Sequence, residues 1–430
     1  MSNKDYNARA IALDMLQSVL RRGQAFDEVM EQHVKLPELD KRDRAFVYML
    51  VATVLRRLGQ IDEIIKASLD KPQMLKGLVE DLLRLGVCQI LFLRTPAHAA
   101  VDTIVGLAAQ ENITKPYKNM INAVLRRIVR EGTAQLEKQD VARLNVPDWL
   151  WLNWRKTYGT ALTRKIAEAN MNEAALDITV KDSVSEWSEA LEAKILPNKS
   201  LRREESSALT ELPGFAQGAW WVQDAAASLP VKLFGDIRGE VVVDLCAAPG
   251  GKTAQLAAAG AHVIAVDRSA KRLNRLKENL VRLKLTAEIV RSDALKFQPK
   301  QKVRYILLDA PCTATGTIRR HPDVQRLKTP EDMARLVELQ QKLLRHAGTV
   351  LAAGGVLIYA VCSLQADEAE AQIDDLLQAG LDLSRDPIRQ DEVDGISGFI
   401  NPRGELRCLP CHWAEYGGID GFFVARLKRN

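Results

Sequence analysis

The stretch Glu240–Thr253, with the sequence EVVVDLCAAPGGKT, predicts a buried strand, a turn of mostly small residues and the beginning of a helix. Its β-branched run Val241–Val243 is typical of a parallel strand that is covered on both faces. Asp244 ends the strand, and the backbone of the turn that follows can approach a ligand closely. The free N–H groups at the beginning of the next helix favour a nucleotide-like ligand at this turn.

The spacing within the turn argues against two common nucleotide-binding motifs. A P-loop would need a glycine at the position of Cys246, and a dinucleotide-binding turn would need GxGxxG rather than the adjacent pair Gly250-Gly251. A nucleoside ligand without a pyrophosphate remains, and S-adenosylmethionine is such a ligand. Asp267 supports it, because it ends the next predicted strand, where a carboxylate can accept hydrogen bonds from both ribose hydroxyls. Lys252 is expected to cap the turn or to contact a target phosphate.

Strand and helix patterns alternate after this point and predict a doubly wound, Rossmann-like α/β sheet. Further apolar strands end at Asp293, Asp309 and Cys362, and ligands of such sheets bind at the carboxyl ends of the strands. In the N-terminal region, apolar residues recur three and four positions apart, which is typical of α-helices. We therefore expect an all-α domain over residues 1–140, a small α+β subdomain over 146–225 and the cofactor-binding α/β domain over 226–430.

The composition sets limits on the class of protein. The chain has 430 residues and a formal net charge of +5, which permits an anionic partner such as RNA. We find no apolar stretch long enough to span a membrane and no signal-peptide pattern, so we expect a cytoplasmic protein without a membrane partner. Six cysteines in this length do not indicate a disulfide framework. The motif Cys408–His412 matches a haem-attachment pattern by letter, but without an export signal neither haem nor a metal site is expected.

Two further features are compatible with RNA binding. A basic cluster within Lys115–Arg130 could contact phosphates, although a solvated helix face explains it equally well. Six of the seven tryptophans lie between Trp149 and Trp221. Tryptophans can stack on unpaired bases, but core positions are their more common use.

Two cysteines follow the ends of predicted strands, Cys312 in the motif Asp309-Ala310-Pro311-Cys312 and Cys362 in the motif YAVCS. A single buried cysteine is usually a small apolar side chain, but two at corresponding strand ends beside a cofactor turn favour chemistry. A thiolate that adds to carbon 6 of a cytosine makes carbon 5 nucleophilic enough to take a methyl group from S-adenosylmethionine, and a second thiol can assist the release step. Asp309 could hydrogen-bond the N3 edge of the base, which must be flipped out of its stack.

The motifs DLCAAPGGKT, VDRS, LDAPCTATGTIRRHPD, YAVCS and DGFFVARL resemble the RNA cytosine-C5 methyltransferase family. The helical region, with NMINAVLRRI, is similar to the NusB-like domain that is fused to bacterial enzymes of the Fmu/Sun/RsmB type. The resemblance implies S-adenosylmethionine as cofactor and RNA as partner, either 16S ribosomal RNA or a 30S assembly intermediate, with cytosine 967 as the methylated base. We further expect a monomer.

The resemblance also assigns roles residue by residue. Cys362 matches the nucleophile, Cys312 the cysteine that assists release, and Asp309 a catalytic carboxylate. Val361 and Thr313 stand where the family usually has Thr and Ser, and both departures concern the orientation or hydrogen bonding of a thiolate rather than the type of reaction. The family's cofactor contacts fall on Cys246, Ala247, Ala248, Pro249, Gly250, Gly251, Lys252, Asp267, Asp293 and Asp309.

The residues leave other functions open. The same reaction on transfer RNA fits the catalytic motifs equally well, and only the NusB-like fusion favours 16S ribosomal RNA. A non-catalytic RNA-binding factor could retain a methyltransferase-like shell, but the intact Asp309, Cys312 and Cys362 argue against it. A small-molecule methyltransferase would have no obvious use for the helical and tryptophan-bearing extensions.

Overall fold

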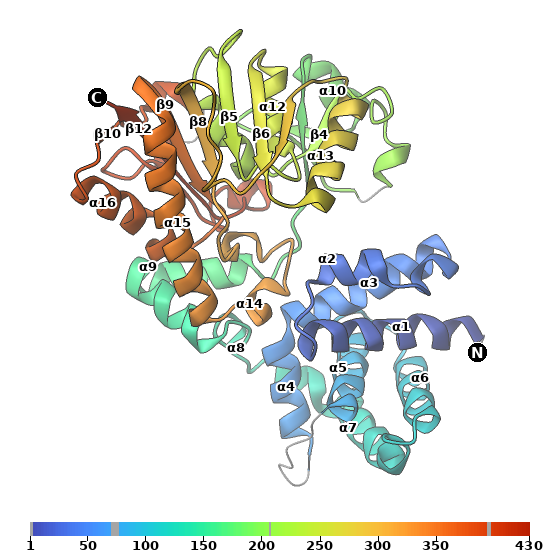
Figure 1. Ribbon diagram of the computed structural model, residues 1–430. Coiled ribbons are helices and arrows are strands. Elements are labelled where there is room, and N and C mark those ends of the chain that lie inside the picture. Colours follow the sequence, from blue (N-terminus) through green and yellow to red (C-terminus); the bar gives the residue numbers. More distant parts are fainter. Residues whose placement is uncertain (1–2, 70–76, 206–207, 394–396) are drawn as a thin grey trace. The chain divides into compact units, whose positions relative to one another are not determined.

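The computed structural model describes residues 3–69, 77–205, 208–393 and 397–430, and the chain forms two compact units (Figure 1). The helical unit consists of Met1–Asn172 and Arg320–Thr329. The sheet unit consists of Glu173–Arg319 and Pro330–Asn430. The chain therefore passes from one unit to the other three times.

The helical unit is an all-α domain, as the apolar spacing predicts (Figure 1). Residues at helical spacing form one apolar core, in which Met15, Leu50 and Ile61 are completely buried. Burying each such side chain contributes roughly 1.5–3 kcal/mol to folding. The helices of this unit are α1 (Asn3–Leu20), α2 (Phe26–Gln32), α3 (Lys41–Arg56), α4 (Leu58–Ala67), α5 (Leu78–Leu91), α6 (Ala97–Gln110), α7 (Lys118–Leu136), α8 (Val141–Leu144), α9 (Asp148–Ala169) and α14 (Val324–Leu327).

Helix α9 lies in the helical unit, although the sequence analysis expects a separate subdomain to begin at residue 146. Two tryptophans of this helix, Trp151 and Trp154, are buried and do not offer their ring faces to a base. On its exposed side, Arg164 pairs with Asp140 at 2.8 Å, which joins α9 to the segment before α8. The local sequence pattern shows a helix here, but it does not show which core the helix joins.

The short segment Arg320–Thr329 comes from the connection between two strands of the sheet unit, yet it belongs to the helical unit. The carboxylate of Asp323 accepts a hydrogen bond from the Phe26 N–H at 3.0 Å, next to the beginning of α2. Arg326 Nη2 donates to the carbonyl oxygen of Asn145 at 2.7 Å. Both bonds join residues that are far apart in sequence, so this segment is an integral part of the helical domain.

The large sheet of the second unit has the strand order β10-β12-β9-β8-β5-β6-β7, and β11 pairs with β12 (Figure 1). The five strands from β7 to β9 in this order are parallel, whereas β12 is antiparallel to β9. Because β5 lies between β6 and β8, the strand order reverses at β5, and this reversal is where doubly wound sheets bind their ligands. The strands are β5 (Val241–Leu245), β6 (His262–Asp267), β7 (Glu288–Arg291), β8 (Val303–Asp309), β9 (Leu351–Val361), β10 (Leu383–Arg385), β11 (Leu406–Cys408) and β12 (Phe422–Arg429).

Helices cover both faces of the large sheet, which confirms the predicted doubly wound fold (Figure 1). Val242 on β5 packs against the side with α11 (Leu229–Lys232) and α12 (Gly251–Ala258). Val243, one residue later, packs against α15 (Pro330–Val350) and α16 (Glu370–Gln378). This alternation explains why the strand reads as a continuous apolar run. Helix α13 (Ala270–Leu283) buries a stripe of leucines beside α12.

A second, smaller sheet precedes the large one in the chain, with the order β2-β3-β1-β4. Arg202 and Asp177 form an ion pair of 2.6 Å at its centre, and both side chains are at most 1% exposed. Arg202 Nη1 also donates to the carbonyl oxygens of Tyr416 and Gly418, which ties this sheet to the end of the chain. Its elements are β1 (Leu176–Val180), α10 (Val184–Ala190), β2 (Lys194–Ile195), β3 (Leu201–Arg203) and β4 (Trp220–Val222).

No helix among the described residues is long and apolar enough to cross a membrane.

Candidate active site

The turn between β5 and α12 lies at the carboxyl end of β5, at the point where the strand order reverses. Gly250 has a φ of +105°, and a Cβ atom built there would lie 2.8 Å from Leu276 Cγ, so both the backbone and its neighbour require glycine. At Gly251, by contrast, the nearest atom to such a Cβ would be 3.9 Å away. A Cβ atom at Gly251 would therefore make only an ordinary van der Waals contact, so the neighbours of the second glycine do not exclude a side chain there.

Asp267 ends β6 and lies against this turn. Its Oδ2 atom accepts a hydrogen bond from the Ala248 N–H at 3.2 Å, and its Oδ1 atom accepts one from the Ser269 N–H at 2.8 Å. Arg272 on α13 approaches the same carboxylate, with 3.6 Å between Nη1 and Oδ2, and also donates to the carbonyl oxygen of Ala248. The structure thus brings the predicted acidic residue to the turn, together with an arginine that the sequence analysis did not single out.

Asp244 lies beneath the turn and is completely buried. Its Oδ2 atom accepts a hydrogen bond from Thr253 Oγ1 at 2.6 Å, whereas its Oδ1 atom has no partner in the part of the chain that the structure describes. Burial raises the pKa of Asp244 to about 7, and the nearby Asp309 adds to the shift. An unpartnered polar atom aimed into a buried site is a natural contact for a bound ligand.

Asp293 lies one strand further from the turn than Asp267 does. It follows β7, the edge strand that pairs with β6, and is exposed. Its Oδ1 atom accepts a hydrogen bond from the Leu295 N–H at 3.0 Å. Asp293 therefore lies at the carboxyl ends of the strands, as predicted, but its carboxylate is hydrogen-bonded to a residue of its own loop.

Lys252 lies in the first turn of α12 and reaches across to the end of β8. Its Nζ atom is 2.7 Å from Asp309 Oδ2 and 5.0 Å from the centroid of the Phe422 ring. Burial alone lowers the pKa of Lys252, but the charge and hydrogen bond of Asp309, together with the charge of Cys362, outweigh burial and raise it. Lys252 therefore remains an ammonium, and it is engaged with Asp309 rather than with the turn that precedes it.

Cys312 and Cys362 lie side by side, with 3.5 Å between their Sγ atoms. Cys312 follows β8 and Cys362 follows β9, and these strands are parallel neighbours, with Asp309 opposite Ala360. The hydrogen bond with Cys362 raises the pKa of Cys312 well above its usual value, and burial and the charge of Glu368 add to this shift. Cys312 is thus a thiol that can donate its S–H to Cys362.

Cys246 differs from this pair. Burial, with contributions from Asp309 and Asp267, raises the pKa of Cys246 to about 12, so it is a neutral thiol in the wall of the turn. The described residues contain no group of three or more His, Cys, Asp or Glu side chains arranged to hold a metal ion.

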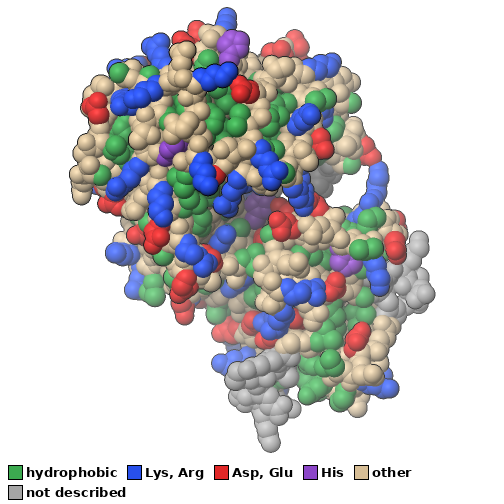
Figure 2. Space-filling view, in the orientation of Figure 1, with side chains coloured by type: hydrophobic (Ala, Val, Ile, Leu, Met, Phe, Trp, Pro, Cys, Tyr) green, Lys and Arg blue, Asp and Glu red, His purple; other side chains and the backbone are tan. Residues whose placement is uncertain are grey.

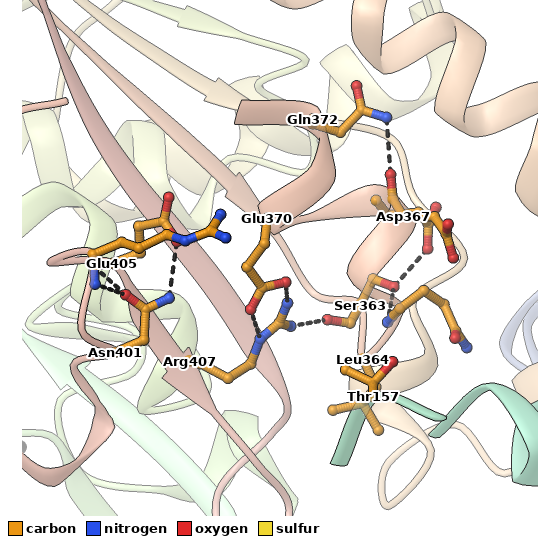
Figure 3. A network of polar contacts seen from close by, with 12 residues as sticks. Thr157, Ser363, Leu364, Asp367, Glu370, Gln372, Asn401, Glu405 and Arg407 are labelled. Carbon is orange, nitrogen blue, oxygen red and sulfur yellow. Dashed lines mark hydrogen bonds and ion pairs between the residues drawn. The ribbon is translucent and has the colours of Figure 1, made fainter. Parts of the chain in front are cut away.

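A polar network supports the loop that carries Cys362 (Figure 3). Arg407 on β11 pairs with Glu370, at 3.0 Å between Nε and Oε1, and its Nη1 atom donates to the carbonyl oxygen of Ser363 at 2.7 Å. On the other side, Ser363 Oγ donates to Glu368. The sequence analysis missed these residues because nothing in the local pattern shows that their side chains meet.

The fold and this site define the class of S-adenosylmethionine-dependent methyltransferases. Residues 234–428 match the family model described as 16S rRNA methyltransferase RsmB/F, and residues 6–130 match the NusB family model. Ribosomal RNA small subunit methyltransferase B of Pasteurella multocida is 36% identical over 98% of this chain and 96% of that protein. The protein of the same name from Proteus mirabilis is 34% identical over 99% of both chains. The chain belongs to this family and is an S-adenosylmethionine-dependent ribosomal RNA methyltransferase.

Two solved structures show similar folds. The crystal structure of PH0851 covers 100% of both chains with a TM-score of 0.75 at 24% sequence identity. A methyltransferase homologue from Pyrococcus horikoshii covers 67% of this chain and 97% of its own length, with a TM-score of 0.57 at 26% identity. These likenesses agree with the fold described above, and the family membership confirms both the predicted resemblance and the predicted cofactor.

Proposed function

We propose that the protein methylates carbon 5 of a cytosine in 16S ribosomal RNA, cytosine 967, through a covalent bond between Cys362 and carbon 6 of the base. The observation that carries the proposal is the 3.5 Å contact between the Sγ atoms of Cys312 and Cys362 at the ends of two neighbouring strands. The relatives' name and the matched family model support the choice of 16S ribosomal RNA. The target position rests on the resemblance alone.

Each residue of the site has a role in this reaction. Cys362 Sγ forms a bond to carbon 6, and the electron pair of the double bond between carbons 5 and 6 moves onto carbon 5, which becomes the nucleophile. After carbon 5 has taken the methyl group, its proton passes to a water molecule and the electron pair returns to the bond between carbons 5 and 6. The bond to Cys362 then breaks and releases the thiolate, which can accept a hydrogen bond from the S–H of Cys312, 3.5 Å away. We assign the hydrogen bond to the N3 edge of the cytosine to Asp309, and the ion pair with Lys252, which orients this carboxylate, supports the assignment.

The residues around the turn fit S-adenosylmethionine, which supplies an electrophilic methyl group when it is bound. We assign its binding to the turn Cys246–Lys252 with Asp267, Asp293 and Asp309. The unpartnered Oδ1 atom of Asp244 and the hydrogen bond that holds the Asp267 carboxylate against the turn support this assignment. Because the Asp267 carboxylate already accepts two backbone N–H bonds, its orientation is fixed before a ribose arrives.

We also propose how the chain binds its RNA. The helical unit acts as an RNA-binding domain, with the exposed basic side chains of Lys115, Lys118, Arg126 and Arg130 as phosphate contacts. On the face that Figure 2 shows, basic side chains lie among acidic and apolar ones. The substrate is free 16S ribosomal RNA or a 30S assembly intermediate, and the enzyme acts as a cytoplasmic monomer.

A trapping experiment tests the proposal. Cys312→Ala and Cys362→Ala variants, with Cys411→Ala as a matched control, are incubated with 16S ribosomal RNA and S-adenosylmethionine and run on a denaturing gel. We expect Cys312→Ala alone to accumulate a ribonuclease-sensitive slow band, because the adduct forms but is not released. A band with Cys362→Ala instead would reverse the two roles.

The same experiment separates the other functions. Methyl transfer to transfer RNA but not to 16S ribosomal RNA would change the substrate and keep the chemistry. RNA binding without a trapped band and without methyl transfer by the wild type would mean that the chain is a non-catalytic RNA-binding factor.

A further inference from the structure

The two loops that carry the cysteines share one buried carboxylate, that of Glu368. Glu368 Oε1 accepts a hydrogen bond from the Thr313 N–H at 2.9 Å, and this N–H belongs to the peptide group between Cys312 and Thr313. Glu368 Oε2 accepts hydrogen bonds from Thr313 Oγ1 and Ser363 Oγ, each at 2.5 Å. The residue after each cysteine is thus bound to the same carboxylate group.

Further bonds fix the carboxylate itself. Gln340 on α15 donates from Nε2 to Glu368 Oε1 at 3.1 Å and to the carbonyl oxygen of Pro311 at 2.8 Å. Tyr359 on β9 donates from its hydroxyl to the carbonyl oxygen of Glu368 at 2.6 Å. Glu368 is therefore held from a helix and from a strand, and it has little freedom to follow a movement of either cysteine loop.

The donors to this carboxylate are all uncharged, and in the part of the chain that the structure describes Glu368 forms no ion pair. A buried charge without a counter-ion is costly, and hydrogen bonds to a carboxylate offset only part of that cost. A glutamine would fill a similar volume without the charge. Both oxygens of Glu368 accept hydrogen bonds, and the amide of a glutamine would offer only one acceptor oxygen, so the arrangement favours a carboxylate at this position.

The charge has an identifiable effect on the nearer thiol. The hydrogen bond with Cys362 and burial are the main causes that raise the pKa of Cys312, and the negative charge of Glu368 raises it further. A carboxylate at this place therefore helps to keep the proton on Cys312. Through its hydrogen bond with Ser363, the Glu368 carboxylate also orients the loop that carries Cys362. The carbonyl oxygen of Cys362 in turn accepts a hydrogen bond from the Gly316 N–H at 3.0 Å.

We propose that Glu368 is a positioning residue that fixes the two thiols at contact distance by holding the residue that follows each of them. The roles of the two thiols rest on the proposed function. The hydrogen bonds of the Glu368 carboxylate do not depend on the proposed function, so the positioning role and the proposed function can be tested separately.

The test compares Glu368→Gln with Glu405→Gln in the full-length protein. Glu405 is a suitable control because it is also buried, at 2% exposure, but it binds Arg385 and Asn401 rather than the cysteine loops. Without RNA, two quantities are measured for each protein: the rate at which diamide forms a disulfide between Cys312 and Cys362, and the pH dependence of iodoacetamide labelling of each cysteine by peptide mass spectrometry.

We expect Glu368→Gln to slow disulfide formation about tenfold, because thiols that are displaced by a fraction of an ångström to an ångström meet less often in a reactive geometry. Removal of the negative charge should also shift the labelling of Cys312 to lower pH, and methyl transfer should fall about 10- to 100-fold. Glu405→Gln should leave both thiol measurements at their wild-type values. A purely structural role of Glu368 would lower the melting temperature but leave both the rate of disulfide formation and the labelling profile of Cys312 at their wild-type values, and this result would overturn the proposal.

A second pair of variants covers the case in which Glu368→Gln does not fold. Thr313→Val removes one hydroxyl donor while Glu368 stays in place, and Thr313→Ser keeps that donor. The proposal requires slower disulfide formation in Thr313→Val and a wild-type rate in Thr313→Ser, whereas equal rates in both would overturn it. If the wild type fails to methylate any RNA but the thiol measurements behave as expected, the proposed function fails and the role of Glu368 stands.

Discussion

Lys252 Nζ lies 2.7 Å from Asp309 Oδ2, so the first turn of the helix after the glycine turn is ion-paired with the carboxylate that precedes Cys312. The contact joins residues from two different crossover units of the sheet, and the ring of Phe422, on β12, covers the ammonium. The cofactor turn and the cysteine loop are thereby coupled through a charged hydrogen bond.

Lys252→Met should reduce methyl transfer about a hundredfold, because the loss of the ammonium leaves Asp309 without the partner that orients it. Single-turnover methylation of 16S ribosomal RNA measures the effect on the chemical step. Lys271→Met, on the exposed side of α13, is the control and should keep wild-type turnover. Equal rates in both variants would show that the ion pair has no part in the reaction.

Asp244→Asn should change how stability depends on pH. Because the folded state raises the pKa of this carboxyl from 3.8 to about 7, the folded protein binds more protons than the unfolded chain between these values. The contribution of Asp244 to stability is therefore present below pH 4 and is lost as pH rises towards 7. Relative to wild type, Asp244→Asn should become progressively more stable over this window, by up to about 4 kcal/mol.

Urea unfolding at several pH values measures the difference, and the exposed Asp182→Asn variant serves as control. A constant difference between Asp244→Asn and wild type from pH 4 to pH 8 would contradict the prediction.

Gly250→Ala should weaken binding of S-adenosylmethionine at least tenfold. The added methyl group would lie 2.8 Å from Leu276 Cγ, and the φ of +105° is unfavourable for alanine, so the turn must move. Isothermal titration calorimetry measures the affinity. Gly354→Ala is a matched control, since Gly354 also has a positive φ, +70°, but nothing lies within 4 Å of the added atom. Similar losses of affinity in both variants would mean that backbone strain anywhere in the sheet unit, rather than the turn, is responsible.

Arg202→Met should destabilise the sheet unit by about 3–5 kcal/mol, because it leaves the completely buried Asp177 without its counter-ion. Chemical denaturation followed by circular dichroism gives the free energy of unfolding. Lys194→Met breaks the exposed ion pair with Glu204 instead, and its stability should match that of wild type. A small effect of Arg202→Met would show that water or a rearranged neighbour compensates Asp177.

The fold and the ends of its strands could be predicted from sequence because both depend on local patterns. An apolar run such as Val241–Val243, followed by a turn of small residues, is visible within a dozen letters, and parallel strands bring their carboxyl ends to one edge. The same reasoning placed Cys312 and Cys362 near each other, since β8 and β9 are neighbours.

The contacts between side chains could not be predicted in this way. Lys252 lies 57 positions from Asp309, and no period in the sequence records that pairing. Glu368 reads as one acidic residue among several in a polar segment, and only the structure shows that it is buried between two loops. Which of the two units contains α9 likewise depends on packing rather than on helical spacing.

Because Arg320–Thr329 belongs to the helical unit, no single cut in the chain separates the two units. A fragment that ends near residue 172 would lack the Asp323 carboxylate that accepts the Phe26 N–H, and a fragment that begins there would carry a helical piece without its partners. On the ribosome, the N-terminal helices are made first, but their domain is completed only when these ten residues emerge, after β5–β8, four of the eight strands of the large sheet, have been synthesised. The helical domain can therefore be completed only after β8, the strand that precedes Cys312, has been synthesised.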